Sequence, residues 1–404
     1  MRSARRPDAP GVRAVLLAAV LVAGCAGTPD VSSERPSPGA ATTGVPSTST
    51  TGEPASTEGF PTAAFAKLNE KRLDVATAAM LQRTLDDAAG DNGVTATLMT
   101  ANGTWTGATG TTDGVKPMRP EAQMAIGSIT KTIIAAQVMQ LVEAGRLGLD
   151  DPAADHLPKK ADFDANGATV GDLLAMRSGI PDYVDALYSS LLTDTRHVWT
   201  ADKLLALVPP RRTPAGSEFD YSSTNYILLG LILEHATGRS VAETLRDGVL
   251  DEPGFARLVY QPAERPTGPM AAPGGAPALS TRQGVGYVPS LAGATAAGPA
   301  GGMASDSVTL ARWWGRLCSG QIVSEVALER MTDFDQSPEY GLGLQDRSAY
   351  DSPSAVGNEG VHVGFVSIAE CLPEEAAVVV VLINDEEADS ASVASALTAA
   401  MRSR

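Results

Sequence analysis

The stretch Ala377-Val-Val-Val-Val-Leu-Ile383 is a run of seven apolar residues, five of them β-branched. Such a run predicts a strand that is buried on both faces. A second strand is predicted at 365–369, because the polar turn Pro373-Glu-Glu joins it to the first. Far upstream, Val94-Thr-Ala-Thr-Leu-Met-Thr100 and a return strand from Thr104 flank the hairpin signal Asn102-Gly103. We therefore predict one antiparallel sheet built from both ends of the folded region.

Helices are predicted around this sheet. Ala, Leu and Met recur at helical spacing over 63–90, where Gly90 ends the pattern, and the segments 307–318 and 388–402 are also helical. Residues 151–299 contain helical segments and Pro/Gly-rich loops but no good strand pair. The predicted fold class is α/β (α+β): an antiparallel sheet flanked by helices, with an inserted all-helical domain. The domain spans 61–404, with its α/β part in 61–150 and 300–404 and its helical part in 151–299.

The amino terminus has the pattern of an export signal. Four Arg precede the uncharged run Ala14-Val-Leu-Leu-Ala-Ala-Val-Leu-Val-Ala-Gly24, which at eleven residues is too short to span a membrane. The run ends in Val22-Ala-Gly-Cys25, which resembles the lipobox of bacterial lipoproteins. The resemblance implies a signal peptide over 1–24 and lipidation of Cys25; the alternative is a secretory signal with an incidental Cys. We expect an extracytoplasmic protein held on the cell membrane by its lipid.

Residues 25–60 are predicted to form a linker. Of the 35 residues 26–60, 23 are Gly, Pro, Ser or Thr, and they include no aliphatic cluster around which a core forms. The predicted role of this segment is to hold the folded domain away from the membrane.

Composition and charge exclude several function classes. The chain has 404 residues and a net charge of −16; the first 24 contribute +3, so the remainder carries −19. Such a surface repels phosphate backbones, and we expect no nucleic-acid partner. Three Cys and four scattered His form no zinc motif, and no phosphate-binding Gly-rich loop is found. We expect neither a metal nor a cofactor.

The first candidate catalytic motif is Ile126-Gly-Ser-Ile-Thr-Lys131, at the start of an apolar helix. Ser128 and Lys131 are three residues apart and therefore share one helix face. A serine hydroxyl becomes a good nucleophile when a neighbouring base takes its proton, and a desolvated Lys can do this. The helix N-terminus also favours an oxyanion nearby. Read alone, the motif also fits a helix-capping Ser followed by a surface Lys.

Two further motifs hold candidate site residues. Tyr221, in Phe219-Asp-Tyr-Ser-Ser-Thr-Asn-Tyr226, precedes an apolar helix and is placed to shuttle a proton. In Gly360-Val-His-Val-Gly-Phe365, which we expect to open a strand, His362 would face the cleft and Gly364 would let backbone pass close to a ligand. The N–H of Phe365 is a candidate oxyanion donor together with that of Ser128. Taken singly, the Tyr also fits a helix cap and the His a structural role.

In this order the three motifs resemble the SxxK, YxN and KTG or HxG signatures of the serine β-lactamase and penicillin-binding superfamily. Within this superfamily, the chain resembles class C β-lactamases, exported D-alanyl-D-alanine carboxypeptidases and related esterases. The similarity covers about residues 65–400 and includes further segments: Leu147-Gly-Leu-Asp-Asp151, Thr169-Val-Gly-Asp-Leu-Leu174, Ser178-Gly-Ile180, Pro214-Ala-Gly216, Gly301-Gly-Met-Ala-Ser-Asp306 and Tyr340-Gly-Leu-Gly343.

The resemblance implies a β-lactamase/transpeptidase-like fold and a role for each motif residue. Ser128 is the acylated nucleophile, Lys131 its base or proton relay, and Tyr221 the second general acid/base. His362 and Gly364 form the wall that meets a substrate carboxylate. The implied function is that of an exported serine hydrolase working through an acyl-enzyme on D-Ala-D-Ala-type peptides, β-lactams or esters. The alternative is a non-catalytic penicillin-binding or sensor lipoprotein with the same fold.

One position departs from the family pattern. Ser223 stands where the family usually has the Asn of YxN, and a hydroxyl is shorter and offers a single donor. We therefore expect Ser223 to affect substrate recognition.

Cys318 ends a predicted helix and Cys371 lies near the end of a predicted strand. Helix-on-sheet packing is therefore expected to join them in a disulfide; the alternative is two buried thiols.

Overall fold

The computed structural model describes residues 59–403 apart from 211, 275–285, 338 and 349–351. The predicted signal peptide, the lipidation site Cys25 and the linker up to residue 58 lie outside the described residues. Within the described part, no helix is both long and apolar enough to cross a membrane.

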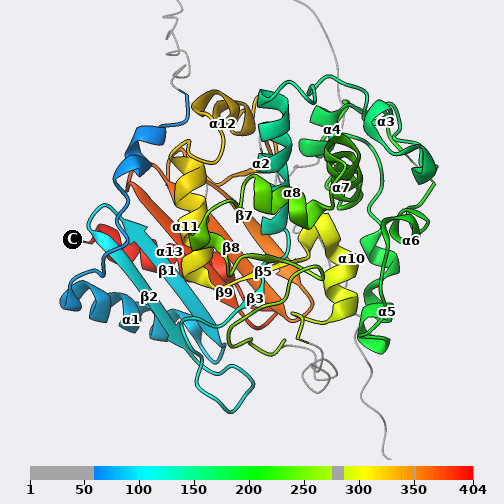
Figure 1. The fold of residues 1–404 in the computed structure, drawn as a ribbon. Coiled ribbons are helices and arrows are strands. Elements are labelled where there is room, and N and C mark those ends of the chain that lie inside the picture. Colours follow the sequence, from blue (N-terminus) through cyan, green and yellow to red (C-terminus); the bar gives the residue numbers. More distant parts are fainter. Residues whose placement is uncertain (1–58, 211, 275–285, 338, 349–351, 404) are drawn as a thin grey trace, which may run out of the picture. The chain divides into compact units, whose positions relative to one another are not determined.

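The centre of the domain is a six-stranded antiparallel sheet in the order β2-β1-β9-β8-β7-β6 (Figure 1). The strands are β1 (Val94–Thr100), β2 (Gly103–Thr109), β6 (Gln345–Asp346), β7 (Val356–His362), β8 (Phe365–Leu372) and β9 (Ala377–Ile383). β1 pairs with β2 across the predicted hairpin and with β9 along its whole length, Val94 opposite Ile383 and Thr100 opposite Ala377. The prediction that the two ends of the domain form one sheet is confirmed.

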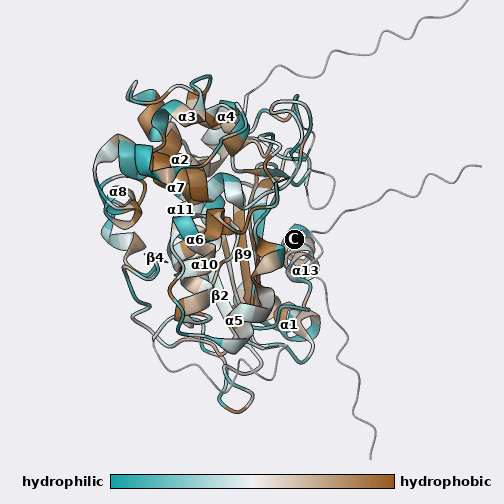
Figure 2. Cartoon of the chain, turned by 90° about the vertical axis from the view of Figure 1, so that its right-hand side faces the viewer, coloured by the Kyte–Doolittle hydropathy of each residue, from teal (hydrophilic) through white to brown (hydrophobic). Residues whose placement is uncertain are grey.

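Helices cover both faces of this sheet. α1 (Val75–Ala89) and α13 (Ser390–Arg402) lie on one face, and α11 (Ser307–Cys318) crosses the other. Figure 2 shows the strongly apolar β9 between these two layers. The predicted helix over 63–90 is divided into η1 (Thr62–Lys67) and α1, because Asp74 accepts hydrogen bonds from the N–H groups of Ala76 and Thr77 and so starts a new helix.

The inserted region is mainly helical. Its helices are α3 (Ala153–His156), η2 (Lys159–Ala161), α4 (Val170–Leu174), η3 (Val184–Ala186), α5 (Tyr188–Thr193), α6 (Ala201–Leu205), α7 (Thr224–Thr237), α8 (Val241–Asp247), η4 (Pro253–Phe255) and α10 (Leu291–Gly301). One short strand, β4 (Val259–Tyr260), pairs with β5 (Met303–Ser305), which also pairs with β3 (Met124–Ala125). The prediction of an all-helical insert is therefore wrong at β4. A strand of two residues is too short to show the alternation of apolar and polar residues that identifies a strand.

α2 (Ile129–Glu143) lies between the sheet and the inserted helices. It contacts α7, α8 and α10 on one side and β7 and β8 on the other, and twelve of its fifteen residues are buried. α12 (Glu325–Met331) completes the described helices. The N-terminus of α2 therefore lies where the helical region meets the sheet.

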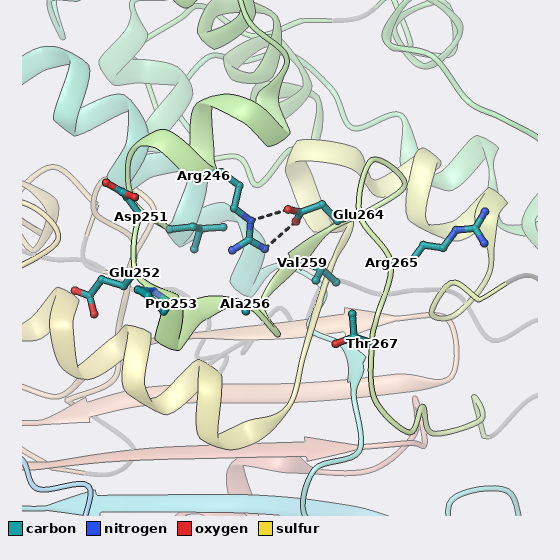
Figure 3. A pocket seen from close by; sticks show the side chains of 10 residues that line it. Arg246, Asp251, Glu252, Pro253, Ala256, Val259, Glu264, Arg265 and Thr267 are labelled. Carbon is teal, nitrogen blue, oxygen red and sulfur yellow. Dashed lines mark hydrogen bonds and ion pairs between the residues drawn. The ribbon is translucent and has the colours of Figure 1, made fainter.

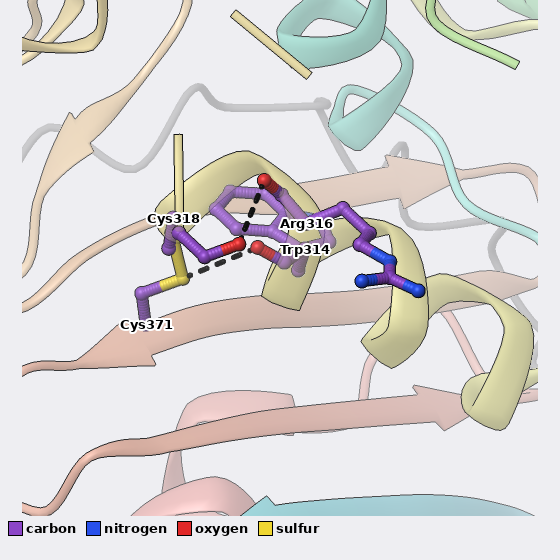
Figure 4. Close-up of a disulfide and its surroundings, with 5 residues drawn as sticks. Trp314, Arg316, Cys318 and Cys371 are labelled. Carbon is purple, nitrogen blue, oxygen red and sulfur yellow. Dashed lines mark hydrogen bonds between the residues drawn. A yellow bond between two sulfur atoms is a disulfide. The ribbon is translucent and has the colours of Figure 1, made fainter. Parts of the chain in front are cut away.

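A disulfide joins Cys318, the last residue of α11, to Cys371 of β8 (Figure 4). Both residues are fully buried, and their Cα atoms are 6.6 Å apart. The bond fastens α11 onto the sheet face that it covers.

Candidate active site

Ser128 and Lys131 meet at the first turn of α2. Ser128 occupies the N-cap position and is half-buried, whereas the Lys131 side chain is only 1% exposed. Lys131 Nζ donates to Ser128 Oγ at 3.0 Å and to the carbonyl oxygen of Ala300 at 2.7 Å. The amine is thus aimed at the candidate nucleophile and removed from solvent.

Tyr221 reaches the same hydroxyl from the segment before α7. Its phenol donates to Ser128 Oγ at 2.9 Å, and its ring centroid lies 5.0 Å from Lys131 Nζ. Tyr340 packs edge-on against the Tyr221 ring at 6.1 Å. The structure thus brings together the three side chains that the sequence assigned to catalysis.

The Ala300 carbonyl is available because it lies in the last turn of α10, which ends at Gly301. Gly298 has φ 43° and ψ −129°, which no α-helical residue adopts, and Pro299 lacks an N–H. The helix is therefore kinked just before Ala300, whose carbonyl has no helical N–H four residues ahead and accepts from Lys131. The sequence segment Gly301-Gly302-Met303 pointed to this region but not to the preceding carbonyl.

The backbone of the third motif, residues 360–365, contacts the turn that precedes Ser128 through residues other than those we expected. An added β-carbon on Gly127 would lie 2.7 Å from the Val361 carbonyl oxygen and 2.8 Å from its nitrogen, and one on Gly360 would lie 2.0 Å from the Ile126 oxygen. Phe365 instead pairs with His362 across the β7–β8 hairpin. The backbone N–H beside the Ser128 turn is therefore that of Val361, which corrects the assignment to Phe365.

His362 ends β7 rather than opening a strand, and it is 8% exposed. Its Nδ1 accepts from the N–H of Val363, and the ring packs near Gly293 at the start of α10. Burial lowers the pKa of His362 to about 4. The imidazole is thus neutral near pH 7, and its role in meeting a substrate carboxylate stays a prediction.

Gly364 occupies the hairpin turn with φ +77°. Its N–H donates to Glu386 Oε2 at 2.8 Å, and an added β-carbon would lie 2.2 Å from Pro273 Cβ. We expected the backbone of Gly364 to pass close to another group, and in the structure that group is Pro273.

Ser223 lies two residues after Tyr221 and is 8% exposed. Its N–H donates to Asp182 Oδ2 at 2.9 Å, which fixes the backbone at the start of α7. Asn225 is fully buried and accepts from the Ser178 hydroxyl, so it does not replace the missing Asn.

Asn358, which sequence reasoning did not single out, lies behind the site. It is fully buried, and its amide donates to Thr132 Oγ1 at 3.0 Å and to the Gly343 carbonyl at 3.3 Å. It links β7 to α2 one residue after Lys131.

A cavity of about 500 Å³ lies elsewhere, between α8 and the segment around β4 (Figure 3). Arg246 and Glu264 form a two-point ion pair at its wall, at 2.6 and 2.9 Å. None of the residues that line it belongs to the Ser128 cluster. Within the described part of the chain, no group of three or more His, Cys, Asp or Glu is placed to hold a metal ion.

Comparisons with known proteins show the family to which the sequence is similar. The sequence model of the family described as Beta-lactamase matches residues 77–400. Protein flp of Staphylococcus aureus (strain NCTC 8325 / PS 47) is 32% identical over 139 residues, 32% of this chain and 26% of flp. The putative penicillin-binding protein PbpX of Bacillus subtilis (strain 168) is 24% identical over 249 residues, 61% of this chain and 58% of PbpX. The chain thus spans about a quarter of flp and rather more than half of PbpX.

Two solved structures have a similar fold. A D-stereospecific amidohydrolase from Streptomyces sp. superposes with a TM-score of 0.65 at 27% identity, over 78% of this chain and 97% of that protein. The D-amino acid amidase from Ochrobactrum anthropi SV3, solved with D-phenylalanine, gives a TM-score of 0.67 at 24% identity, over 81% and 100%. The predicted α/β fold class with its antiparallel sheet is confirmed.

Proposed function

Since the chain belongs to the Beta-lactamase family of serine hydrolases, we propose that it hydrolyses amides and esters of D-amino acids through an acyl-enzyme on Ser128. D-Ala-D-Ala-type peptides and β-lactams, both of which carry a free carboxylate, are expected to be slower substrates. The observation that carries the proposal is that Ser128 Oγ receives hydrogen bonds from both Lys131 Nζ and the Tyr221 phenol. A merely structural N-cap Ser would bond to its own helix, and Ser128 makes no such side-chain cap.

Acylation begins when the Lys131–Tyr221 pair has lost one proton. The pair takes the hydroxyl proton of Ser128 while Oγ attacks the substrate carbonyl, and the oxyanion formed is stabilised by the N–H groups of Ser128 and Val361. Collapse breaks the bond to the leaving group, which receives a proton from Tyr221 or Lys131. Water then attacks the acyl-enzyme while the same pair takes its proton. Collapse of this second intermediate breaks the bond to Ser128 Oγ, which receives that proton from the pair, and the acid is released.

One observation supports the D configuration of the proposed substrate, and a second supports the absence of a free carboxylate on it. The amidohydrolase and the amidase with similar folds are described as acting on D-configured compounds. In addition, the strand beside Ser128 is β7, and it presents the buried Asn358 and the neutral His362 rather than a cation. An amide or ester without a free carboxylate at this wall needs no such cation.

Export and lipid anchoring remain part of the proposal. They rest on the Arg-rich start, the eleven-residue apolar run and Cys25, followed by the Gly/Pro/Ser/Thr-rich linker. The partners proposed are thus a small-molecule or peptide substrate and a membrane reached through the lipid.

A substrate panel tests the proposal. D- and L-phenylalanine amide, the p-nitrophenyl ester of each, and a chromogenic cephalosporin would be assayed with the parent and Ser128→Ala. We expect the D-amide and the D-ester to be turned over faster than their L-forms, the cephalosporin slowly, and none by the variant. Equal rates on both enantiomers, or a cephalosporin faster than both D-substrates, would contradict the substrate assignment.

A further inference from the structure

A second tyrosine ring lies against Lys131, on the residue Tyr226 that the proposed mechanism does not use. Lys131 Nζ is 5.7 Å from the centroid of the Tyr226 ring and 5.0 Å from that of Tyr221. Both distances are within the range over which an ammonium is attracted to an aromatic face. The amine is therefore flanked by two rings.

Lys131 needs such stabilisation because it is buried without a carboxylate. It is 1% exposed, and its hydrogen-bond partners are the Ser128 hydroxyl and the Ala300 carbonyl. Within the described part of the chain no carboxylate forms an ion pair with it. A buried ammonium is costly unless other groups replace its hydration, and two ring faces and a carbonyl are what the fold supplies.

Tyr226 is held firmly in this position. It lies in the first turn of α7, is fully buried, and its hydroxyl donates to the Leu174 carbonyl at 3.2 Å. Burial also raises the pKa of Tyr226, so its phenol stays neutral. The side chain therefore acts on Lys131 through its ring face and not by proton transfer.

We propose that Tyr226 is a positioning residue whose ring face stabilises the protonated form of Lys131 and so sets the pH at which Ser128 becomes reactive. This inference rests on the proposed acyl-enzyme function. The titratable groups around Lys131 are Tyr221 and Tyr226 before and in α7, Tyr340 beside them, and His362 of β7. Burial keeps Tyr226 and Tyr340 neutral by raising their pKa values, and His362, with a pKa of about 4, is neutral above pH 5. Tyr226, Tyr340 and His362 therefore do not supply the acid limb of reactivity above pH 5.

Variants at position 226 separate the ring from the rest of the side chain. Tyr226→Phe and Tyr226→Leu both lose the hydrogen bond to Leu174, but only Phe keeps the aromatic face. A Phe variant carrying 3,4,5-trifluorophenylalanine keeps the shape of the ring and weakens its negative face. The readout is the rate of Ser128 phosphonylation by a fluorophosphonate from pH 5 to 10, which needs no knowledge of the natural substrate.

We expect the acid limb of Tyr226→Phe to lie close to that of the parent. It should move to lower pH by about one unit in Tyr226→Leu and by a smaller shift in the fluorinated variant, because the ammonium loses stabilisation worth up to about tenfold. Coincident limbs in the Phe, trifluoro-Phe and Leu variants would overturn the role of Tyr226 and leave the acyl-enzyme proposal intact. A parent whose Ser128 does not react at any pH would overturn both. If the Leu variant does not fold, the comparison of Phe with trifluoro-Phe decides the question.

Discussion

The α-carbon of Gly127 lies directly against the backbone of Val361, with no room between them for a β-carbon. Gly127 also has φ +50°, a conformation that L side chains rarely adopt. This contact sets the Ser128 turn beside the N–H of Val361, the second proposed oxyanion donor. Gly127→Ala should therefore push the strand away and lower kcat by at least about a hundredfold, as expected for loss of one such donor. The measurement is steady-state kinetics on an activated ester.

Gly114→Ala is the matched control for backbone strain. Gly114 also has a positive φ, +82°, but a β-carbon there would meet nothing within 4 Å. Both substitutions incur the conformational cost, and only the first displaces Val361. A similar loss of kcat in both variants would refute the positional role of Gly127.

The lowered pKa of His362 should make the free energy of unfolding depend on pH. Its pKa is lowered by burial to about 4, whereas an unfolded His titrates near 6.5. Between these values the unfolded chain binds a proton that the folded chain does not, so the folded state loses stability as pH falls from about 6.5 to 4, by up to about 3 kcal/mol. Denaturant unfolding from pH 4 to 8 should show a shallower pH dependence for His362→Gln than for the parent. His235, an exposed residue of α7, provides the control variant His235→Gln, and equal pH dependence in all three proteins would contradict the assignment.

The disulfide predicts a large contribution to stability. Cys318 and Cys371 are 53 residues apart, and a loop of this length corresponds to about 4 kcal/mol of unfolded-state entropy in the chain model. The double variant Cys318→Ala/Cys371→Ala should have an unfolding free energy lower by about 2–4 kcal/mol, measured with urea. Activity at 25 °C should persist, because neither Cys is part of the Ser128 cluster. Two free thiols titrated in the denatured, unreduced parent would show that the bond does not form.

Ser223 predicts substrate preference. Its hydroxyl replaces a longer amide, and an unmade hydrogen bond in a desolvated cleft costs about 1–3 kcal/mol, or roughly ten- to a hundredfold in rate. Ser223→Asn should raise the acylation rate by a penicillin relative to that by a simple ester, since the ester lacks a side-chain amide. Stopped-flow acylation with both compounds gives the ratio. If this ratio does not change, Ser223 is not a recognition residue.

The sheet was predictable where the chain is strongly apolar. The run Ala377–Ile383 and the stretch Val94–Thr100 have strand composition, and they pair in the structure. β7 was missed because Gly357 and Gly360 weaken any strand pattern. Both glycines are needed there, since a β-carbon would lie 2.6 Å from the Ala369 oxygen at Gly357 and 2.0 Å from the Ile126 oxygen at Gly360.

The catalytic side chains were predictable and their backbone partners were not. Ser128, Lys131 and Tyr221 carry chemistry that their residue types reveal, and the structure brings them together. The Ala300 carbonyl and the Val361 N–H carry no residue signature, because every residue has such groups. The third motif was misplaced for the same reason. The side chain of His362 is recognisable in the sequence, whereas the backbone N–H of Val361 is not.

The central claim is that Ser128 becomes acylated, and peptide mass spectrometry of the acid-quenched, digested protein tests it most directly. The parent, Ser128→Ala and Lys131→Ala would be incubated with an activated D-phenylalanyl ester, quenched in acid and digested. The account predicts an acyl adduct of one equivalent on the peptide that contains Ser128 in the parent, none in Ser128→Ala, and a strongly slowed adduct in Lys131→Ala. An adduct on another residue, or hydrolysis that persists in Ser128→Ala within about tenfold of the parent rate, would contradict it.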